Sequence, residues 1–181
     1  MEYNAPVPAK GIPHPLPEGI TGVYRLIEIA TNERYKALIA FCGLEGCRVA
    51  EALAVKPCDF DLDEMELTIR GKGDKTRIVP VSTAAWDVLQ IPVTRAFVSG
   101  GCEVVGLKDR FARRVITDLG KRAGLRRPIS SHDLRATFAT EVYNRTLDIR
   151  LVQELLGHSS SQTTELYTGV QRAAMRKAVE L

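Results

Sequence analysis

The sequence predicts a mainly α-helical domain with one small antiparallel β-sheet, an α+β arrangement. Apolar residues recur with helical spacing along most of the chain, and β-prone runs are confined to residues 65–81. The chain has 181 residues, of which 45% are hydrophobic. A single domain of this size buries a full core without disulfides or a structural metal ion.

The start of the chain differs in composition from the rest. Residues 1–18 contain five prolines, which fit neither a helix interior nor a central strand. We therefore expect residues 1–19 to form a proline-rich linker or N-terminal arm, and residues 20–181 to form the folded domain.

Helices are predicted on both sides of a single hairpin. The β-prone runs MELTIR (65–70) and TRIVPV (76–81) flank GKGDK, a turn that contains two glycines. Gly43 and Pro57 are plausible stops for the helices that precede them. The predicted helices cover residues 21–29, 34–42, 49–55, 83–91, 107–123, 131–144, 149–156 and 171–179.

The cysteines and the hydropathy indicate a cytoplasmic protein with no membrane partner. No apolar run approaches the roughly 20 residues that cross a bilayer, and the start lacks the pattern of a secretory signal. The four cysteines form no CxxC pair and have no partner histidines. They are expected to be reduced thiols of an intracellular protein.

Positive charge is concentrated in one segment. The whole chain carries a net charge of +3, whereas residues 107–127 hold eight basic and two acidic side chains, a net charge of +6. Such a stripe either faces a polyanion such as DNA or forms a solvated helix face. The candidate DNA-binding residues in it are Lys108, Arg110, Arg113 and Arg114.

Two arginines occupy positions near predicted helix starts. In SHDLRATFAT, His132 and Arg135 are three residues apart and share one helix face, and Ser130 or Ser131 is the expected N-cap. His132 then lies in the first turn, where backbone N–H groups favour an anion. The alternative is a capped amphipathic helix on which Arg135 forms a surface ion pair.

In GCRVAEAL, Arg48 begins a short helix and Glu51 lies one turn later. A guanidinium held in place by a carboxylate is a pre-organised ligand for phosphate.

The hairpin turn offers two lysines, Lys72 and Lys75. A nucleotide phosphate loop would need GKT or GKS before a helix, whereas GKGDKT lies between two strands. A lysine on this turn either reaches over a bound backbone or is simply solvated.

ELLGHSSSQTTELYTGV (154–170) places His158 at the end of an apolar run and Tyr167 nine positions later, in a polar segment. Taken alone, Tyr167 is explained as a half-buried aromatic with a local hydrogen-bond partner. Together with two arginines, two histidines and a lysine, it fits metal-free phosphoryl transfer with tyrosine as the nucleophile. The acids of residues 59–64 lack matching partners elsewhere, so no Mg²⁺ site is expected. Ionising a tyrosine at pH 7 costs roughly 4 kcal/mol, which requires a nearby base or a positive field.

Four segments, in this order, resemble the sequence boxes of tyrosine recombinases of the phage integrase family. GCRVAEAL is similar to the first arginine box, and GKGDKTRIVPV to the hairpin lysine box. SHDLRATFAT resembles the HxxR box, and LLGHSSSQTTELYTGV the closing histidine and tyrosine box. The resemblance extends from about residue 20 to residue 172.

The resemblance assigns a role to each box residue. Glu51 would support the arginines, Lys72 would protonate the 5′-oxygen, and Tyr167 would be the nucleophile. The residues that would bind and activate the scissile phosphate are Arg48, His132, Arg135 and His158.

The resemblance also implies the fold and the biology. We expect the tyrosine recombinase catalytic-domain fold, and site-specific DNA recombination or viral genome integration through a 3′-phosphotyrosyl intermediate. The expected partners are double-stranded recombination sites and other copies of the chain, as a tetramer on DNA, in a bacterial or phage-infected cell. No metal or other cofactor is implied. The alternatives are nicking and rejoining by a type IB topoisomerase-like enzyme, and a non-catalytic DNA-binding module.

Both ends of the chain raise separate questions. Family members carry a helical core-binding domain before the catalytic domain, whereas here only the proline-rich arm precedes it. We expect either the catalytic half of a longer protein or a naturally short member. The C-terminal tail, residues 171–181, is expected to dock on a neighbouring protomer, and a terminal helix packed on its own domain is the alternative.

Overall fold

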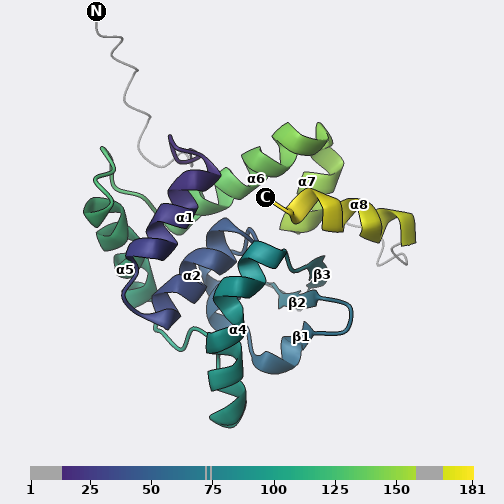
Figure 1. The fold of residues 1–181 in the computed structure, drawn as a ribbon, viewed down its shortest axis with the longest axis horizontal. Helices are drawn as coiled ribbons and strands as arrows, with labels where there is room; N and C mark the ends of the chain where they lie inside the picture. Colours follow the sequence, from purple (N-terminus) through teal and green to yellow (C-terminus); the bar gives the residue numbers. More distant parts are fainter. Residues whose placement is uncertain (1–13, 72, 74, 158–168) are drawn as a thin grey trace, which may run out of the picture.

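The computed structural model describes residues 14–71, 73, 75–157 and 169–181. Its helices are α1 (Ile20–Ile29), α2 (Glu33–Gly43), α3 (Val49–Ala54), α4 (Thr83–Val98), α5 (Asp109–Arg122), α6 (Ser131–Thr146), α7 (Ile149–Leu156) and α8 (Gly169–Val179). A 3₁₀ turn, η1, covers Pro57–Asp59, and the strands are β1 (Phe60–Asp61), β2 (Glu66–Arg70) and β3 (Thr76–Pro80). The predicted fold class, mainly α with a small antiparallel sheet, is confirmed (Figure 1). Within the described residues, no helix is both long and apolar enough to cross a membrane.

Helix α2 lies at the centre of the domain (Figure 1). Every residue from Ala37 to Gly43 is buried, and α1, α4 and α6 pack against this helix. Gly43 allows the close approach of α1, because a Cβ atom there would lie 2.6 Å from Cγ1 of Val23. The first arginine box, GCRVAEAL, follows α2 closely in the sequence. The packing of α2 in the core therefore determines where Arg48 lies.

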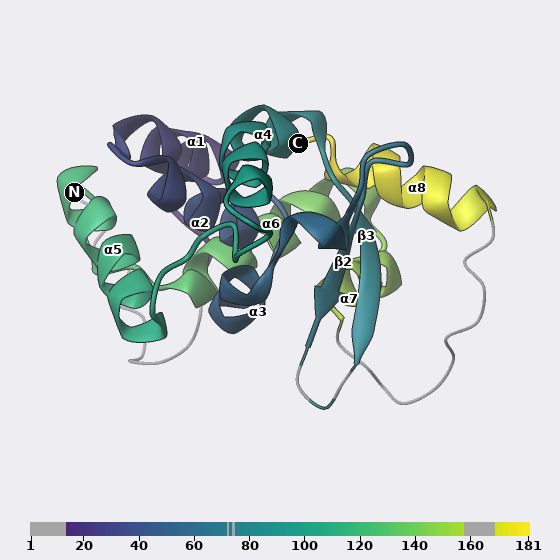
Figure 2. The same ribbon diagram turned by 90° about the horizontal axis from the view of Figure 1, so that it is seen from below.

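The sheet lies at one side of the helices and carries the predicted hairpin (Figure 2). Its strand order is β1-β2-β3, and both pairs are antiparallel. The register pairs Ile69 with Arg77, and the Gly71 N–H donates to the Lys75 carbonyl at 2.7 Å, which closes the turn. The hairpin was predicted. Strand β1 was not, because two residues are too few to display a period.

Helix α4 is longer than predicted. Its expected end was residue 91, because proline lacks an N–H and breaks a helix interior, yet the helix continues through Pro92 to Val98. Leu89, Pro92, Val93 and Ala96 are all buried. Their helical spacing buries a continuous apolar stripe against the rest of the domain, and this packing outweighs the lost backbone hydrogen bond.

The described part of the N-terminal arm lies along α6. The backbone N–H groups of His14, Leu16 and Ile20 donate to side chains spaced four residues apart on that helix, at 3.1, 2.8 and 3.2 Å. The acceptors are Asp133, Thr137 and Glu141. Leu16 is buried in the core, so this end of the arm is attached to the domain.

The C-terminal tail packs on its own domain (Figure 2). Met175, Ala178 and Val179 are buried, and α8 contacts β3 and α6. The Tyr24 hydroxyl donates to the carbonyl of Leu181 at 3.0 Å. These contacts match the alternative of a terminal helix packed in cis, and they speak against docking of residues 174–181 on a neighbouring protomer.

Candidate active site

Glu51 is at the centre of the site. Arg48 is the N-cap residue of α3, and Glu51 occupies the third helical position. The Arg48 backbone N–H donates to Oε2 of Glu51 at 2.8 Å, and its Nη1 donates to Oε1 at 2.8 Å. A glutamate in the first turn satisfies an otherwise unpaired N–H and complements the helix dipole. The predicted pairing of Arg48 with Glu51 is therefore present.

Arg77, on β3, belongs to the site but was not predicted from the sequence. Its Nη1 and Nη2 donate to Oε1 and Oε2 of Glu51 at 3.1 and 2.9 Å, a bidentate pair, and its Nε donates to the Leu155 carbonyl at 3.0 Å. Its side chain is only 9% exposed. Alternation along TRIVPV was the available signal, since it places Arg77 on the same face as the apolar Val79 and Val81.

Arg135, on α6, approaches the same carboxylate from another side. Its Nη1 lies 3.8 Å from Oε2 of Glu51 and donates to the Gly46 carbonyl, and its Nη2 donates to the Leu156 carbonyl at 2.7 Å. Gly46 has a φ of 63°, and a Cβ atom there would lie 2.5 Å from the Phe138 ring. The turn before Arg48 thus requires glycine in order to present its carbonyl to Arg135.

We call Arg48, Arg77 and Arg135 around Glu51 the arginine cluster. Burial alone would raise the pKa of Glu51, but hydrogen bonds and charge from Arg77, and then hydrogen bonds from Arg48, lower it to about 2. Burial lowers the pKa of Arg135 to about 10, with Arg48 acting in the same direction and Glu51 opposing it. A pKa of about 10 still leaves Arg135 charged at neutral pH.

The arginine cluster has a surplus of positive charge, because three guanidinium groups surround one carboxylate. The Arg48 side chain is 42% exposed, whereas that of Glu51 is 4% exposed. The positive side of the cluster is thus open to solvent while its anion is covered. Such an arrangement binds a phosphate and stabilises negative charge that develops on it.

His132 is located at the start of α6, one turn before Arg135, with an exposed side chain. Ser130 is the N-cap residue, and its N–H and hydroxyl both donate to Oδ2 of Asp133, at 2.8 and 2.7 Å. The predicted cap is therefore confirmed, and it presents His132 in the first turn of the helix.

Lys72, His158 and Tyr167 lie outside the described residues. The described neighbours of Lys72 and His158 border the arginine cluster. A Cβ atom on Gly71 would lie 3.6 Å from Oε1 of Glu51, and one on Gly157 would lie 2.8 Å from Cδ of Arg77. The chain thus brings the first arginine box, the hairpin base, the HxxR box and the end of α7 to one place.

The basic stripe is partly neutralised within the protein. Arg113 forms a two-bond ion pair with Asp109, and Arg114 approaches Asp118 at 3.5 Å. Lys108 and Arg110 are exposed and form no ion pair with the described residues. Of the four candidate DNA-binding residues, these two have the charge that is most available to a ligand.

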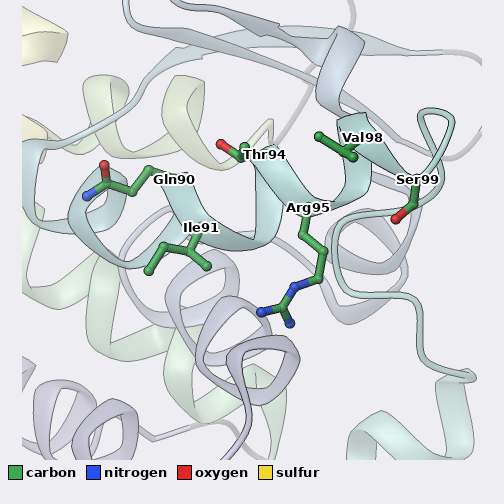
Figure 3. A pocket seen from close by; sticks show the side chains of 6 residues that line it. All are labelled: Gln90, Ile91, Thr94, Arg95, Val98 and Ser99. Carbon is green, nitrogen blue, oxygen red and sulfur yellow. The ribbon is translucent and has the colours of Figure 1, made fainter.

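Other features of the surface lie apart from the arginine cluster. A shallow pocket on α4 is lined by Gln90, Ile91, Thr94, Arg95, Val98 and Ser99 (Figure 3), and none of these residues belongs to the cluster. In the part of the chain that the structure describes, no group of three His, Cys, Asp or Glu side chains could hold a metal ion.

The phage integrase family model matches residues 21–173. Tyrosine recombinase XerA of Pyrococcus horikoshii is 34% identical over 180 residues, which cover 93% of this chain and 62% of that protein. The crystal structure of XerA recombinase has a TM-score of 0.73 at 33% identity, covering 96% of this chain and 68% of that one. The crystal structure of XerH site-specific recombinase bound to difH substrate, a pre-cleavage complex, has a TM-score of 0.67 at 28% identity. The match covers 82% of this chain and 48% of the XerH chain. The chain thus spans about three fifths of the length of this XerA protein.

Proposed function

Because the chain belongs to the phage integrase family, we propose that it cleaves and rejoins DNA at specific sites, as the catalytic domain of a tyrosine recombinase. The observation that carries this proposal is the arginine cluster, in which Arg48 and Arg135 converge on Glu51 and leave a surplus of positive charge. A phosphodiester is the anion that such a site would bind in a DNA strand.

In the proposed mechanism, four residues bind the oxygens of the scissile phosphate: Arg48, His132, Arg135 and His158. The Tyr167 oxygen attacks phosphorus and gives up its proton to a neighbouring base, so that a P–O bond to tyrosine forms. The bond to the 5′-oxygen breaks, and Lys72 supplies the proton to that leaving group. A 5′-hydroxyl from a partner strand reverses these steps and releases Tyr167.

Metal independence is part of the proposal. Positive groups must offset the charge that develops on the phosphorus-bound oxygens, and pre-organised guanidinium groups do this without reorganising in the transition state. The low pKa of Glu51 supports this role, since it reflects how strongly the surrounding arginines favour an anion.

We also propose the partners. The substrate is double-stranded DNA, contacted by the exposed Lys108 and Arg110, and strand exchange takes place in a tetramer in the cytoplasm. The XerH relative was crystallised with its difH substrate, which supports a DNA substrate here. Residues 1–19 are proposed as the connection to a preceding domain, and residues 20–181 as the catalytic domain.

A selection experiment tests the proposal even though the target sequence is unknown. The protein, with any N-terminal domain that its gene encodes, is incubated with nicked duplexes of random sequence, and adducts that survive denaturant are isolated and sequenced. We expect enrichment of one sequence, and strand exchange between two labelled duplexes that carry it. Relaxation of supercoils without sequence preference would instead favour a topoisomerase-like activity, and failure to form any adduct would favour a binding module.

A further inference from the structure

We propose that Arg77 is a positioning residue of the phosphate site. It fixes the orientation of the Glu51 carboxylate relative to Arg48 and Arg135, and it connects the hairpin to the end of α7. This inference rests on the proposed function and adds a residue to it. All three nitrogen atoms of the Arg77 guanidinium donate to acceptors within the protein, namely the two oxygens of Glu51 and the Leu155 carbonyl, so we assign it a positioning role and no contact with the phosphate.

Arg77 fixes the geometry of the carboxylate by donating one hydrogen bond to each oxygen of Glu51. A planar fork that engages both oxygens sets the rotation of the carboxylate, which a single point charge does not. Those same oxygens receive the backbone N–H and the Nη1 of Arg48. The orientation that Arg77 imposes on Glu51 therefore determines where the exposed guanidinium of Arg48 lies.

Arg77 also holds the end of α7. It binds the Leu155 carbonyl, and Arg135 binds the Leu156 carbonyl. The last carbonyls of a helix lack intrahelical partners and carry the negative end of its dipole, so two cations hold this terminus. Gly157 ends α7 with a φ of 64°, and its missing Cβ leaves the space that Arg77 fills. The sequence continues directly into His158.

The hairpin is the third structure that Arg77 engages. Arg77 lies on β3, opposite Ile69, two positions beyond Lys75, whose carbonyl closes the turn. In the sequence, Lys72 lies between Gly71 and Lys75. One side chain thus connects the strand next to the proposed general acid with the carboxylate of the first box and with the helix that precedes His158.

The test compares Arg77→Gln and Arg77→Lys with two controls in the full protein. Val79→Ala lies on the same strand and reports on loss of sheet stability, and Arg70→Gln removes another hairpin arginine, which pairs with the buried Asp59. The readouts are the rate of covalent adduct formation at saturating selected duplex, the affinity for that duplex, and the pKa of the Glu51 carboxyl followed by NMR.

We expect Arg77→Gln to slow adduct formation on the order of 100-fold, because small misplacements of catalytic groups have effects of that size. Its affinity for the duplex should change far less than the rate, because Arg77 makes no direct contact with the phosphate, and the pKa of Glu51 should rise. Arg77→Lys should keep the low pKa of Glu51 but recover only part of the rate, because it restores charge without the fork. Both controls should keep the wild-type rate at temperatures where they are folded.

Two results would overturn the assignment. One is an Arg77→Gln rate that matches that of Val79→Ala at equal folded fraction, and the other is an unchanged pKa of Glu51. If the wild-type protein itself forms no adduct, the proposed function fails, and the Glu51 titration still decides whether Arg77 holds the carboxylate.

Discussion

Among single residues, Glu51 has the largest role, because its charge holds the arginine cluster together. Arg48 and Arg77 bind its two oxygens, and Arg135 lies 3.8 Å away. Without this anion, three cations would face one another in a partly buried place. Removing one partner from such a group leaves uncompensated charge, which is more destabilising than the pair was stabilising.

We therefore predict that Glu51→Gln lowers the free energy of unfolding at pH 7 by about 3–5 kcal/mol. Because the folded protein lowers the pKa of Glu51 from 4.5 to about 2, the stability that Glu51 contributes is complete above about pH 4.5 and is lost as the pH falls toward 2. Denaturant unfolding of both proteins between about pH 7 and pH 2.5 measures this. A difference that stays constant over this range would show that the charge of Glu51 is not responsible.

Four of the described site residues were accessible from the sequence. Spacing placed Glu51 one turn after Arg48 and Arg135 three residues after His132, and the family resemblance supplied their common purpose. Arg77 was not found, because a charged residue in a strand is ordinarily assumed to face solvent. Only the tertiary structure shows that its side chain is buried between the carboxylate on α3 and the end of α7.

At the level of helices and strands, α5 presents two kinds of arginine. Arg110 is exposed without an ion-pair partner among the described residues, whereas Arg113 is engaged by Asp109. An exposed pair of this kind contributes little stability. It does, however, neutralise a charge that would otherwise attract phosphate.

We predict that Arg110→Gln weakens DNA binding and makes its salt dependence weaker. The negative slope of log affinity against log salt should become shallower by about one unit, as expected for one lost phosphate contact. The matched control is the double variant Asp109→Asn with Arg113→Gln, which preserves net charge and should leave the slope unchanged. Titrations of labelled duplex at several salt concentrations measure both. If the control loses as much as Arg110→Gln, Arg113 binds DNA and the ion pair opens on binding.

Helical periodicity predicted the existence of each helix better than its ends. Packing decides where the helices end. In α4, the rule that proline breaks a helix interior predicted an end before Pro92, but the buried Pro92 continues the apolar stripe and the helix extends to Val98. Strand β1 was absent from the prediction because its two residues pair with β2 through the register of a sheet, which no local pattern encodes.

In the molecule as a whole, the two described ends of the chain attach to α6, the helix that carries His132 and Arg135. Residues 14–20 bind its side chains at Asp133, Thr137 and Glu141, and Arg145 near its end binds the Glu180 carbonyl. Chain entry and exit are thus linked to the helix of the HxxR box. The sequence could not predict this, since the arm has no period and the tail has only a narrow apolar stripe.

We predict that deleting residues 174–181 destabilises the isolated domain, because Met175 and Val179 are buried, and burying each such side chain contributes about 1.5–3 kcal/mol. Met175→Ala should have part of this effect, and the neighbouring exposed Arg176→Ala should have little. Thermal unfolding of the three variants measures it. A truncated domain that melts like the wild type would restore the hypothesis that this tail acts on a neighbouring protomer.

The proposed chemistry requires that Tyr167 becomes covalently attached to a DNA phosphate that the arginine cluster activates. Mass spectrometry of the adduct formed on the selected nicked duplex in excess EDTA, after nuclease and protease digestion, identifies the attached residue. We expect a nucleotide joined through its 3′-phosphate to the peptide that contains Tyr167, and no adduct from Tyr167→Phe. The proposed function would be refuted by a nucleotide on another residue, by an adduct from the phenylalanine variant, or by an adduct that forms only when Mg²⁺ is restored.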